Sequence, residues 1–241
     1  MQQSPYTSAF AAVSALDEAV KGDMARLYLA NYDGSSEAIF LHDLSRKDEV
    51  LLVHDADRLI GFTTLRVFER DLSSGPVRVV YSGDTVVDRK HWGQQVLAFE
   101  WITRMGALKR ESPGVPLYWL LLVKGHRTFR YLPLFANSFY PHWRIDRSDL
   151  KPLADTLALE MFPDDYNPER GVVEFRESRG HLKPDIALPP PTDCEREEIR
   201  FFLERNPGFV RGHELVCVCE IETHNMKPLT LRLFRNGSHA D

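Results

Sequence analysis

Residues Val77–Phe99 read VRVVYSGDTVVDRKHWGQQVLAF, and our interpretation of the fold starts from this stretch. Its first half, Val77–Val87, is rich in β-branched residues and predicts a strand. The polar segment Asp88–Gln95 follows, and the apolar spacing of residues 92–109 predicts a helix. Backbone N–H groups at the start of a helix attract anions, and Arg89 would add positive charge. We therefore expect the functional site around this stretch.

Gly83 lies in the interior of the predicted strand, with Asp84 beside it. Glycine weakens a strand and often marks a bulge or a close approach by a ligand. A bulge would splay the strand from its neighbour and open a wedge, although an irregular edge strand explains the same residues. Asp84 is our candidate general base, because partial burial can raise the pKa of a carboxylate. A turn or capping aspartate is the structural alternative.

The elements upstream of this stretch predict two helices and a hairpin. Helical spacing covers Ser14–Tyr32 and Ser35–Leu44. The apolar runs Glu49–His54 and Leu59–Phe68 are joined by a short polar turn, which predicts two antiparallel strands.

The elements downstream alternate between strand and helix. Leu117–Val123 is a continuous apolar run, typical of a strand buried on both faces. His126–Phe139 has the composition of a helix despite Pro133. The order as a whole predicts a mixed α/β fold, with a mostly antiparallel sheet flanked by helices.

The character of the chain changes near Ile145, so we expect a first domain of residues 1–145 and a C-terminal α+β extension of residues 146–241 packed on it. The extension has four expected elements: helices at Leu150–Met161 and Asp193–Arg205, and strands at Val172–Phe175 and Leu215–Glu222.

Composition limits the classes of protein. The chain has 241 residues, 43% of them hydrophobic, which is enough for one sizeable core. Its net charge of −5 gives no support for nucleic acid as a partner. Three cysteines argue against a disulfide framework. We expect no signal peptide and no transmembrane helix, and therefore a soluble, cytoplasmic protein.

The order of hairpin, bulged strand, polar loop, helix, strand and helix resembles the GCN5-related N-acetyltransferase (GNAT) superfamily over about residues 16–143. The segments YSGDTVVDRKHWGQQ and LYWLLLVKGHRTFRYLPLFANSFYPHW also look like a bacterial group of GNAT-like proteins. The resemblance implies a fold that binds acyl-CoA in a wedge between two splayed strands. It also implies a pyrophosphate loop between the bulged strand and the next helix, with the pattern Arg/Gln-x-x-Gly-x-Gly/Ala.

The loop of this chain departs from that pattern. Trp92 stands at the Arg/Gln position, and Gln95 and Leu97 stand where the family has small residues, whereas Gly93 agrees with it. The residues that the resemblance assigns to the cofactor are Val86, Val87, Arg89, Trp92, Gly93, Gln94 and Gln95.

Further candidates come from the loop and from the elements after it. The family's Leu-Tyr-x-x-x-Gly-Phe signature falls on LFANSFY (Leu134–Tyr140), with Phe135 at the tyrosine position, so Tyr131 becomes our candidate acid, and aromatic packing is its structural alternative. His91 can act as a base or touch phosphate, or it is an ordinary loop histidine. Lys124 follows a buried strand, where ligand crevices are common, or it lies at a solvated helix start.

The clustered cysteines are not a metal candidate. Cys217 and Cys219, with His213 nearby, lack the four-ligand spacing of a zinc site and are better explained as core residues. We expect no metal.

The function that the resemblance implies is an acyltransferase that moves an acyl group from an acyl-CoA or carrier-protein thioester to an amine or hydroxyl. Two alternatives remain: a catalytically inactive GNAT-shaped binding or regulatory protein, and a GNAT-fold enzyme with different thioester or lipid chemistry. The expected partners are a small-molecule or lipid-like acceptor and, for one thioester source, an acyl carrier protein. A homodimer is left open.

Overall fold

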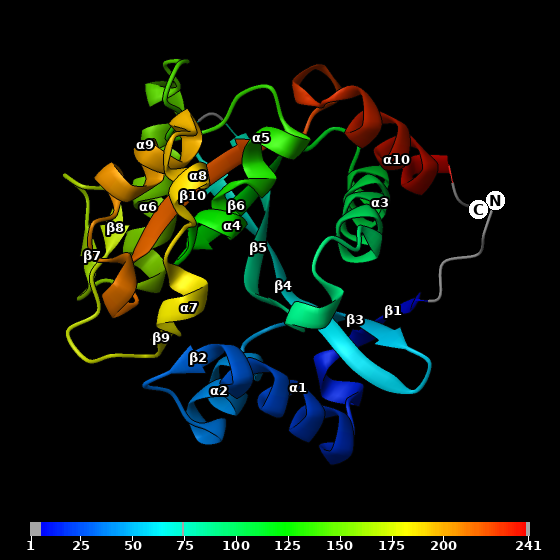
Figure 1. Cartoon of the computed structure of the whole chain (residues 1–241). Helices are drawn as coiled ribbons and strands as arrows, with labels where there is room; N and C mark the ends of the chain where they lie inside the picture. Colours follow the sequence, from blue (N-terminus) through cyan, green and yellow to red (C-terminus); the bar gives the residue numbers. More distant parts are fainter. Residues whose placement is uncertain (1–5, 74, 240–241) are drawn as a thin grey trace. The chain divides into compact units, whose positions relative to one another are not determined.

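A computed structural model of the chain describes residues 6–73 and 75–239, and Figure 1 names its elements. The chain forms two compact units. The first contains the residues up to Ala30, Ser36–Leu117 and the segment from Pro228 onward, and the second contains Asn31–Ser35 and Tyr118–Lys227. The first unit is therefore completed by a segment that follows the second in the sequence. The division of the chain into residues 1–145 and 146–241 stays a prediction.

The sheet of the first unit consists of antiparallel strands. Their order is β1 (Tyr6–Ala12), β3 (Glu49–Asp55), β4 (Arg58–Leu72) and β5 (Gly75–Val87). The expected hairpin between β3 and β4 is confirmed, and Ala56 takes a left-handed conformation in its turn (φ 49°). β1 was not predicted, because small residues (Ser8, Ala9, Ala11 and Ala12) make up more than half of its sequence YTSAFAA and weaken the pattern that marks a strand.

Helix α3 (Val96–Glu111) covers one face of this sheet. The indole Nε1 of its Trp101 donates a hydrogen bond to Ser82 Oγ in β5, at 3.2 Å. The unpredicted helix α10 (Pro228–His239) lies side by side with α3 (Figure 1), and Arg110 of α3 donates to the carbonyl oxygen of Gly237 at 2.9 Å.

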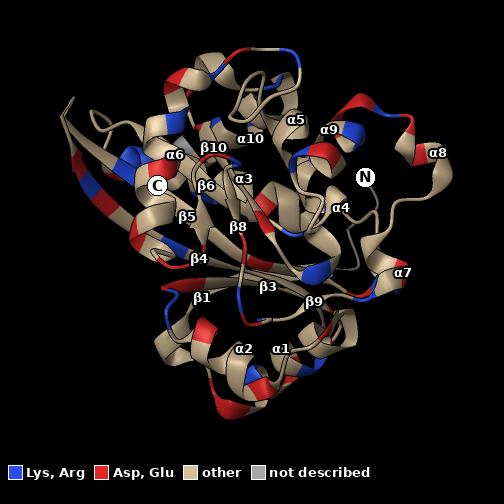
Figure 2. Ribbon diagram, turned by 90° about the vertical axis from the view of Figure 1, so that its left-hand side faces the viewer, with Lys and Arg blue, Asp and Glu red and all other residues tan. Residues whose placement is uncertain are grey.

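Helices α1 (Glu18–Asn31) and α2 (Glu37–Leu44) confirm the two helices expected upstream. Phe40 of α2 contacts Phe62 of β4, with ring centroids 5.8 Å apart. Charges of both signs are distributed along α1 (Figure 2), where Lys21 pairs with Glu18 at 2.8 Å.

The strands of the second unit are also antiparallel where they pair. Their order is β6 (Leu117–Val123), β10 (Glu214–Glu220), β8 (Val172–Val173) and β7 (Tyr166–Asn167), and a separate pair joins β2 (Tyr32–Asp33) to β9 (His181–Leu182). β6 matches its predicted bounds. The two units thus confirm the expected mixed α/β class with mostly antiparallel strands.

The helices of the second unit are short. They are α4 (His126–Phe129), α5 (Tyr131–Phe135), α6 (Lys151–Met161), α7 (Pro184–Ala187), α8 (Pro191–Cys194) and α9 (Glu197–Arg205). The single helix predicted over His126–Phe139 is wrong. Pro133 has no N–H to donate, and its ring would clash with the carbonyl of residue 129 in a continuous helix, so the chain breaks into α4 and α5.

Aromatic residues form the core around α4. The Phe129 ring lies 5.7 Å from the Phe202 ring and 6.0 Å from the Phe139 ring, measured between centroids. These side chains pack on one another and therefore act as a core.

None of the helices in the described part of the chain is long and apolar enough to cross a membrane. A cytoplasmic location stays a prediction.

Candidate functional site

The predicted bulge in β5 is present. Leu65 of β4 faces Ser82, and Thr63 faces Thr85. Between these pairs β4 has one residue, Thr64, whereas β5 has two, Gly83 and Asp84. One extra residue on one strand is the definition of a β-bulge. The glycine in a strand interior was therefore a correct signal.

The bulge turns Asp84 toward the face of the sheet that lies away from α3. Ser82 receives the hydrogen bond from Trp101 and so faces α3. Thr85 is on the same side as Ser82, because their partners Thr63 and Leu65 are two residues apart on β4. Gly83 and Asp84, between them, share the opposite face. Asp84 is half-buried there.

Two side chains occupy the space beside Gly83 on this face. A Cβ on Gly83 would overlap Thr64 Oγ1 and Lys47 Cε, and it would lie 3.2 Å from Lys47 Nζ. These two side chains therefore fill the space beside Gly83 on this face, and the wedge between splayed strands stays a prediction. We call Lys47, Thr64, Tyr81, Gly83 and Asp84 the bulge site.

Lys47 is the residue of this site that the sequence did not reveal. Its side chain is only 2% exposed, and its ammonium pairs with the carboxylate of Asp43 in α2. Nζ also lies 5.3 Å from the centroid of the Tyr81 ring. In the sequence, Lys47 sits in the polar run SRKDE after a helix, a context that is typical of exposed lysines. No signal in the run itself distinguishes it.

The loop between β5 and α3 is held by its own side chains. Asp88 Oδ1 accepts from the Lys90 N–H at 3.1 Å, and its Oδ2 accepts from Arg58 at 2.6 Å. Trp92 Nε1 donates to the carbonyl oxygen of Val87 at 3.0 Å. Gly93 then adopts φ 94°, a conformation that suits glycine, with open space above its Cα. The helix predicted from Trp92 therefore begins only at Val96.

Most of the loop residues that we expected to bind the acyl donor are exposed. Arg89, Lys90, Trp92, Gly93 and Gln95 all face solvent, and the Arg89 guanidinium lies 5.9 Å from the Trp92 ring centroid. The loop thus presents positive charge and a flat aromatic surface directly before a helix of four turns.

The N-terminus of α3 is partly occupied by the chain itself. Gln94 Oε1 accepts from the Leu97 N–H at 3.2 Å, and the Leu97 side chain is buried. The N–H groups of Val96 and Ala98, in the same first turn, have no partner within the helix. The Leu97 side chain thus belongs to the core of the first unit.

His91 and the two valines are fixed by neighbours in the first unit. His91 Nδ1 lies 3.2 Å from the Tyr6 hydroxyl of β1. Asp88 donates its N–H to the Ile60 carbonyl at 2.7 Å. Because N–H directions alternate along an antiparallel strand, Val86 points its N–H toward β4, and Val87 points its N–H away from β4. Of the two valines, Val87 is thus the one whose N–H does not face β4.

Two predicted site residues belong to the second unit. Lys124 Nζ pairs with Glu214 Oε1 at 3.1 Å and lies 5.5 Å from the Tyr32 ring centroid. Burial raises the pKa of Tyr131, which keeps its phenol protonated. The catalytic and ligand roles of both residues stay predictions.

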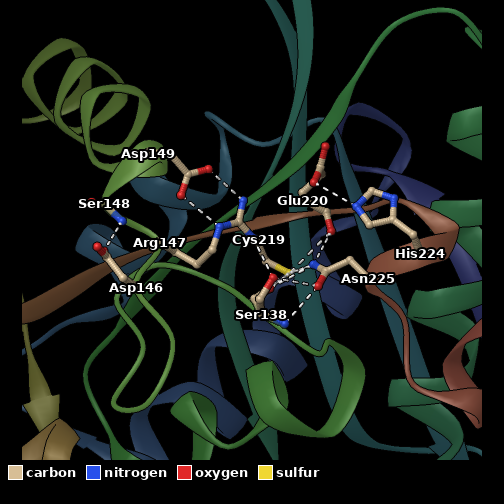
Figure 3. Close-up of polar contacts among 9 residues, drawn as sticks. All are labelled: Ser138, Asp146, Arg147, Ser148, Asp149, Cys219, Glu220, His224 and Asn225. Carbon is tan, nitrogen blue, oxygen red and sulfur yellow. Dashed lines mark hydrogen bonds and ion pairs between the residues drawn. The ribbon is translucent and has the colours of Figure 1, made fainter.

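The second unit also contains a polar cluster that the sequence did not reveal (Figure 3). Buried Asn225 accepts from Ser138 Oγ at 2.9 Å and donates to the Ser138 carbonyl at 2.9 Å. Arg147 donates to Ser138 Oγ at 2.5 Å and makes a two-point ion pair with Asp149. These contacts tie the segment after α5 to the segment after β10. Ser138 Oγ contacts Asn225 and Arg147, and we assign the cluster to structure.

The cysteines of β10 are core residues. Cys217 and Cys219 are buried, and burial raises the pKa of both thiols, that of Cys219 to about 12. Within the part of the chain that the structure describes, no group of three or more His, Cys, Asp or Glu side chains is placed to hold a metal ion.

No protein-family model matches the chain. No protein of curated function matches it in sequence.

Solved structures do resemble it. One is a conserved protein of unknown function from Enterococcus faecalis, described as a probable N-acyltransferase, with 13% identity over 64% of this chain and 43% of that one, at a TM-score of 0.41. Another is a GNAT family N-acetyltransferase from Escherichia coli in complex with CoA, with 17% identity over 52% of this chain and 67% of that one, at a TM-score of 0.37.

A third is a GCN5-related N-acetyltransferase from Kribbella flavida, with 14% identity over 56% of this chain and 34% of that one, at a TM-score of 0.40. The chain spans less than half the length of the first and third of these proteins. The second and third of these proteins are described as GNAT or GCN5-related N-acetyltransferases, and each likeness has a TM-score below 0.5.

Proposed function

We propose that the chain is an acyltransferase that moves an acyl group from an acyl-CoA or carrier-protein thioester to an amine or hydroxyl acceptor. The observation that carries this proposal is the bulge in β5. It places Asp84 on the face away from α3, and three residues later the same strand presents the Val87 N–H away from β4. A base and a hydrogen-bond donor are thus fixed on one strand, which runs directly into the exposed basic loop.

The proposed chemistry is a direct transfer. The amine or hydroxyl of the acceptor attacks the thioester carbonyl carbon, and Asp84, directly or through water, takes its proton. The Val87 N–H stabilises the negative charge that develops on the carbonyl oxygen. The carbon–sulfur bond then breaks, and the released thiolate takes up a proton.

The loop supports binding of the donor's phosphates. Arg89 and Lys90 are exposed on it. The N–H groups of Val96 and Ala98, which have no partner within the helix, lie at the start of α3, where the helix dipole favours an anion. The exposed Trp92 offers a surface on which a nucleobase can stack. These residues are the ones that we propose to hold CoA.

A thermal-shift screen tests donor binding. With CoA, acetyl-CoA and long-chain acyl-CoAs, a ligand at about 100 times its Kd should stabilise the fold by about 2.7 kcal/mol. Replacing Arg89 and Lys90 with Ala should reduce this stabilisation, whereas replacing Lys21 and Arg26 of α1 with Ala should not. A screen in which no CoA species stabilises the chain would exclude the CoA-dependent version.

Turnover tests the base. Asp84→Asn should lower the rate of CoA release by about 10²- to 10⁴-fold while the stabilisation by CoA persists. Asp57→Asn, in the exposed β3–β4 turn, is the matched control. Unchanged turnover in Asp84→Asn would remove Asp84 from the mechanism.

A second function, a GNAT-shaped binding or regulatory protein without catalysis, is favoured by one contact. The Gln94 side chain already occupies the Leu97 N–H, which leaves fewer donors for a phosphate. Gln94→Ala frees that N–H. If CoA binds at this turn, the variant should be stabilised more by CoA than the parent is, and if the turn has no ligand, CoA should stabilise neither.

A further inference from the structure

The ammonium of Lys47 is an unusual feature of the bulge site. A buried positive charge costs free energy unless it is paired and hydrogen-bonded. Here the side chain is 2% exposed, and Asp43 supplies both partners, its carboxylate and its carbonyl oxygen, the latter at 3.3 Å. The Tyr81 ring adds a cation–π contact at 5.3 Å. The fold therefore holds a cation firmly against the bulge.

The ion pair is asymmetric. The Asp43 side chain is 47% exposed, whereas Lys47 is enclosed. Asp43 can therefore turn out into water, but Lys47 cannot, so another partner has to replace Asp43 at the ammonium, because an unpaired buried charge is costly. The contact with Asp43 shows that the enclosed ammonium can pair with a carboxylate.

A second donor lies beside the ammonium without a partner. Thr64 is 1% exposed, and its Oγ1 has no hydrogen-bond partner among the residues that the structure describes. Thr64 Oγ1 and Lys47 Nζ both lie around the point where a Gly83 Cβ would be. A buried hydroxyl without a partner is costly, and a ligand that supplies the missing partner removes that cost.

From these contacts we infer that Lys47 and Thr64 bind a carboxylate group of a small molecule at the bulge site, in place of Asp43. An ammonium and a hydroxyl together offer one donor to each oxygen of a carboxylate. Asp84 shares this face of the strand, so a carboxylate held there would bring the neighbouring amine or hydroxyl of the same molecule toward Asp84. This last step rests on the proposed function and names its acceptor class: carboxylate-bearing amines or hydroxyls, of the amino-acid type.

The test follows the Lys47 side chain by NMR in protein labelled at the lysine ε-carbon and ζ-nitrogen. Its resonance is assigned by its absence from Lys47→Met, a variant whose unbranched side chain keeps the packing on Gly83. The probes are N-acetylglycine, which has a carboxylate, and N-acetylglycinamide, which has the same shape without the charge. We expect the Lys47 resonance to shift with the acid and not with the amide.

Variants sharpen the result. Lys47→Met should weaken N-acetylglycine binding by at least about tenfold, because it removes a charge-assisted hydrogen bond. Lys47→Arg should retain part of the affinity, and Lys21→Met, at a partly exposed lysine of α1, should retain all of it. Equal shifts with acid and amide, no shift with the acid, or unchanged affinity in Lys47→Met would each overturn the inference.

These readouts do not need CoA, so the two proposals fail separately. If the chain binds the acid at Lys47 but no CoA species stabilises it, the carboxylate site is supported and the CoA-dependent acyltransferase is excluded. If CoA stabilises the chain but the acid does not bind at Lys47, the acyltransferase is supported and the carboxylate site is excluded.

Discussion

Gly83 is enclosed on the face away from α3 by Thr64 Oγ1 and Lys47 Cε, and a Cβ would overlap both atoms. The glycine is therefore required by close packing, and its φ is not in the left-handed region. The same missing atom accounts for the burial of Lys47, because the lysine stem occupies the space that a side chain at residue 83 would fill.

Gly83→Ala should therefore lower the free energy of unfolding by about 1–3 kcal/mol, as overpacking of a core does. Urea titration measures it. Gly114→Ala is the matched control, since its Cβ would meet nothing within 4 Å. If both variants were equally stable, the packing of Lys47 against Gly83 would have to be wrong.

Two adjacent threonines of β4 offer a sharper comparison. Thr63 and Thr64 are each 1% exposed, but Thr63 Oγ1 lies 2.8 Å from Thr85 Oγ1, whereas Thr64 Oγ1 has no partner among the described residues. Thr64→Val should raise the free energy of unfolding by about 1 kcal/mol, and Thr63→Val should lower it by a similar amount. Chemical denaturation of the two variants measures this. A loss of stability in Thr64→Val would show that its hydroxyl is satisfied.

The residues of the site differ in how far the sequence could predict them. Gly83 and Asp84 break the local rules of a strand, and that conflict pointed to the bulge. Lys47 breaks no local rule. Its burial depends on β5, more than 30 residues away, so only the packed structure could identify it. Thr64 is also unremarkable in a strand, and its missing partner is a property of the fold.

At the scale of elements, the strands and helices with a strong apolar pattern were predicted well, and those defined by a partner were not. β6 has its predicted bounds because seven consecutive residues, LYWLLLV, are apolar or aromatic. β1 is a strand because it pairs along its whole length with β3, from Tyr6 opposite Asp55 to Ala12 opposite Glu49. Pairing of this kind is not visible in seven residues of sequence.

Helix α10 packs closely on α3 at Gly237. A Cβ on Gly237 would overlap the carbonyl oxygen of Thr103 in α3, which is backbone and cannot rotate away. Gly237→Ala should therefore destabilise the fold, although alanine is the better helix former.

Gly22→Ala in α1 is the control, because its Cβ would meet only the end of the Arg26 side chain, at 3.5 Å. There, helix propensity should add about 0.5–1 kcal/mol of stability. Thermal unfolding of both variants gives the comparison. Stabilisation by both substitutions would contradict the close packing of α10 on α3.

At the scale of the whole molecule, histidines that are buried or partly buried make stability depend on pH. His126 is 1% exposed, its Nδ1 contacts the Ala187 carbonyl at 3.2 Å, and its Nε2 has no partner within the described structure. Burial, then the charge of Arg127, lowers its pKa below the ordinary 6.5. Burial likewise lowers the pKa of His142 and His213.

The folded state therefore holds His126 neutral at a pH where the unfolded chain has already bound a proton. Stability should be full above the unfolded pKa of 6.5 and should fall as the pH drops below it, toward the lowered pKa of the folded state. In His126→Asn, whose amide can still donate to Ala187, the fall should be shallower. Urea unfolding between about pH 7.5 and about pH 5 measures the slopes. Parallel slopes would exclude His126 as a contributor.

The two units also have a consequence for biosynthesis. A ribosome makes residues 118–227 of the second unit before it makes α10, yet α10 packs on α3 of the first unit and receives the hydrogen bond from Arg110. The first unit therefore cannot complete its fold until more than a hundred further residues are translated, and until then the surface of α3 that contacts α10 is uncovered. All segments of the second unit are translated before α10. We therefore expect the second unit to complete its folding before the first unit does, although the first unit begins earlier in the sequence.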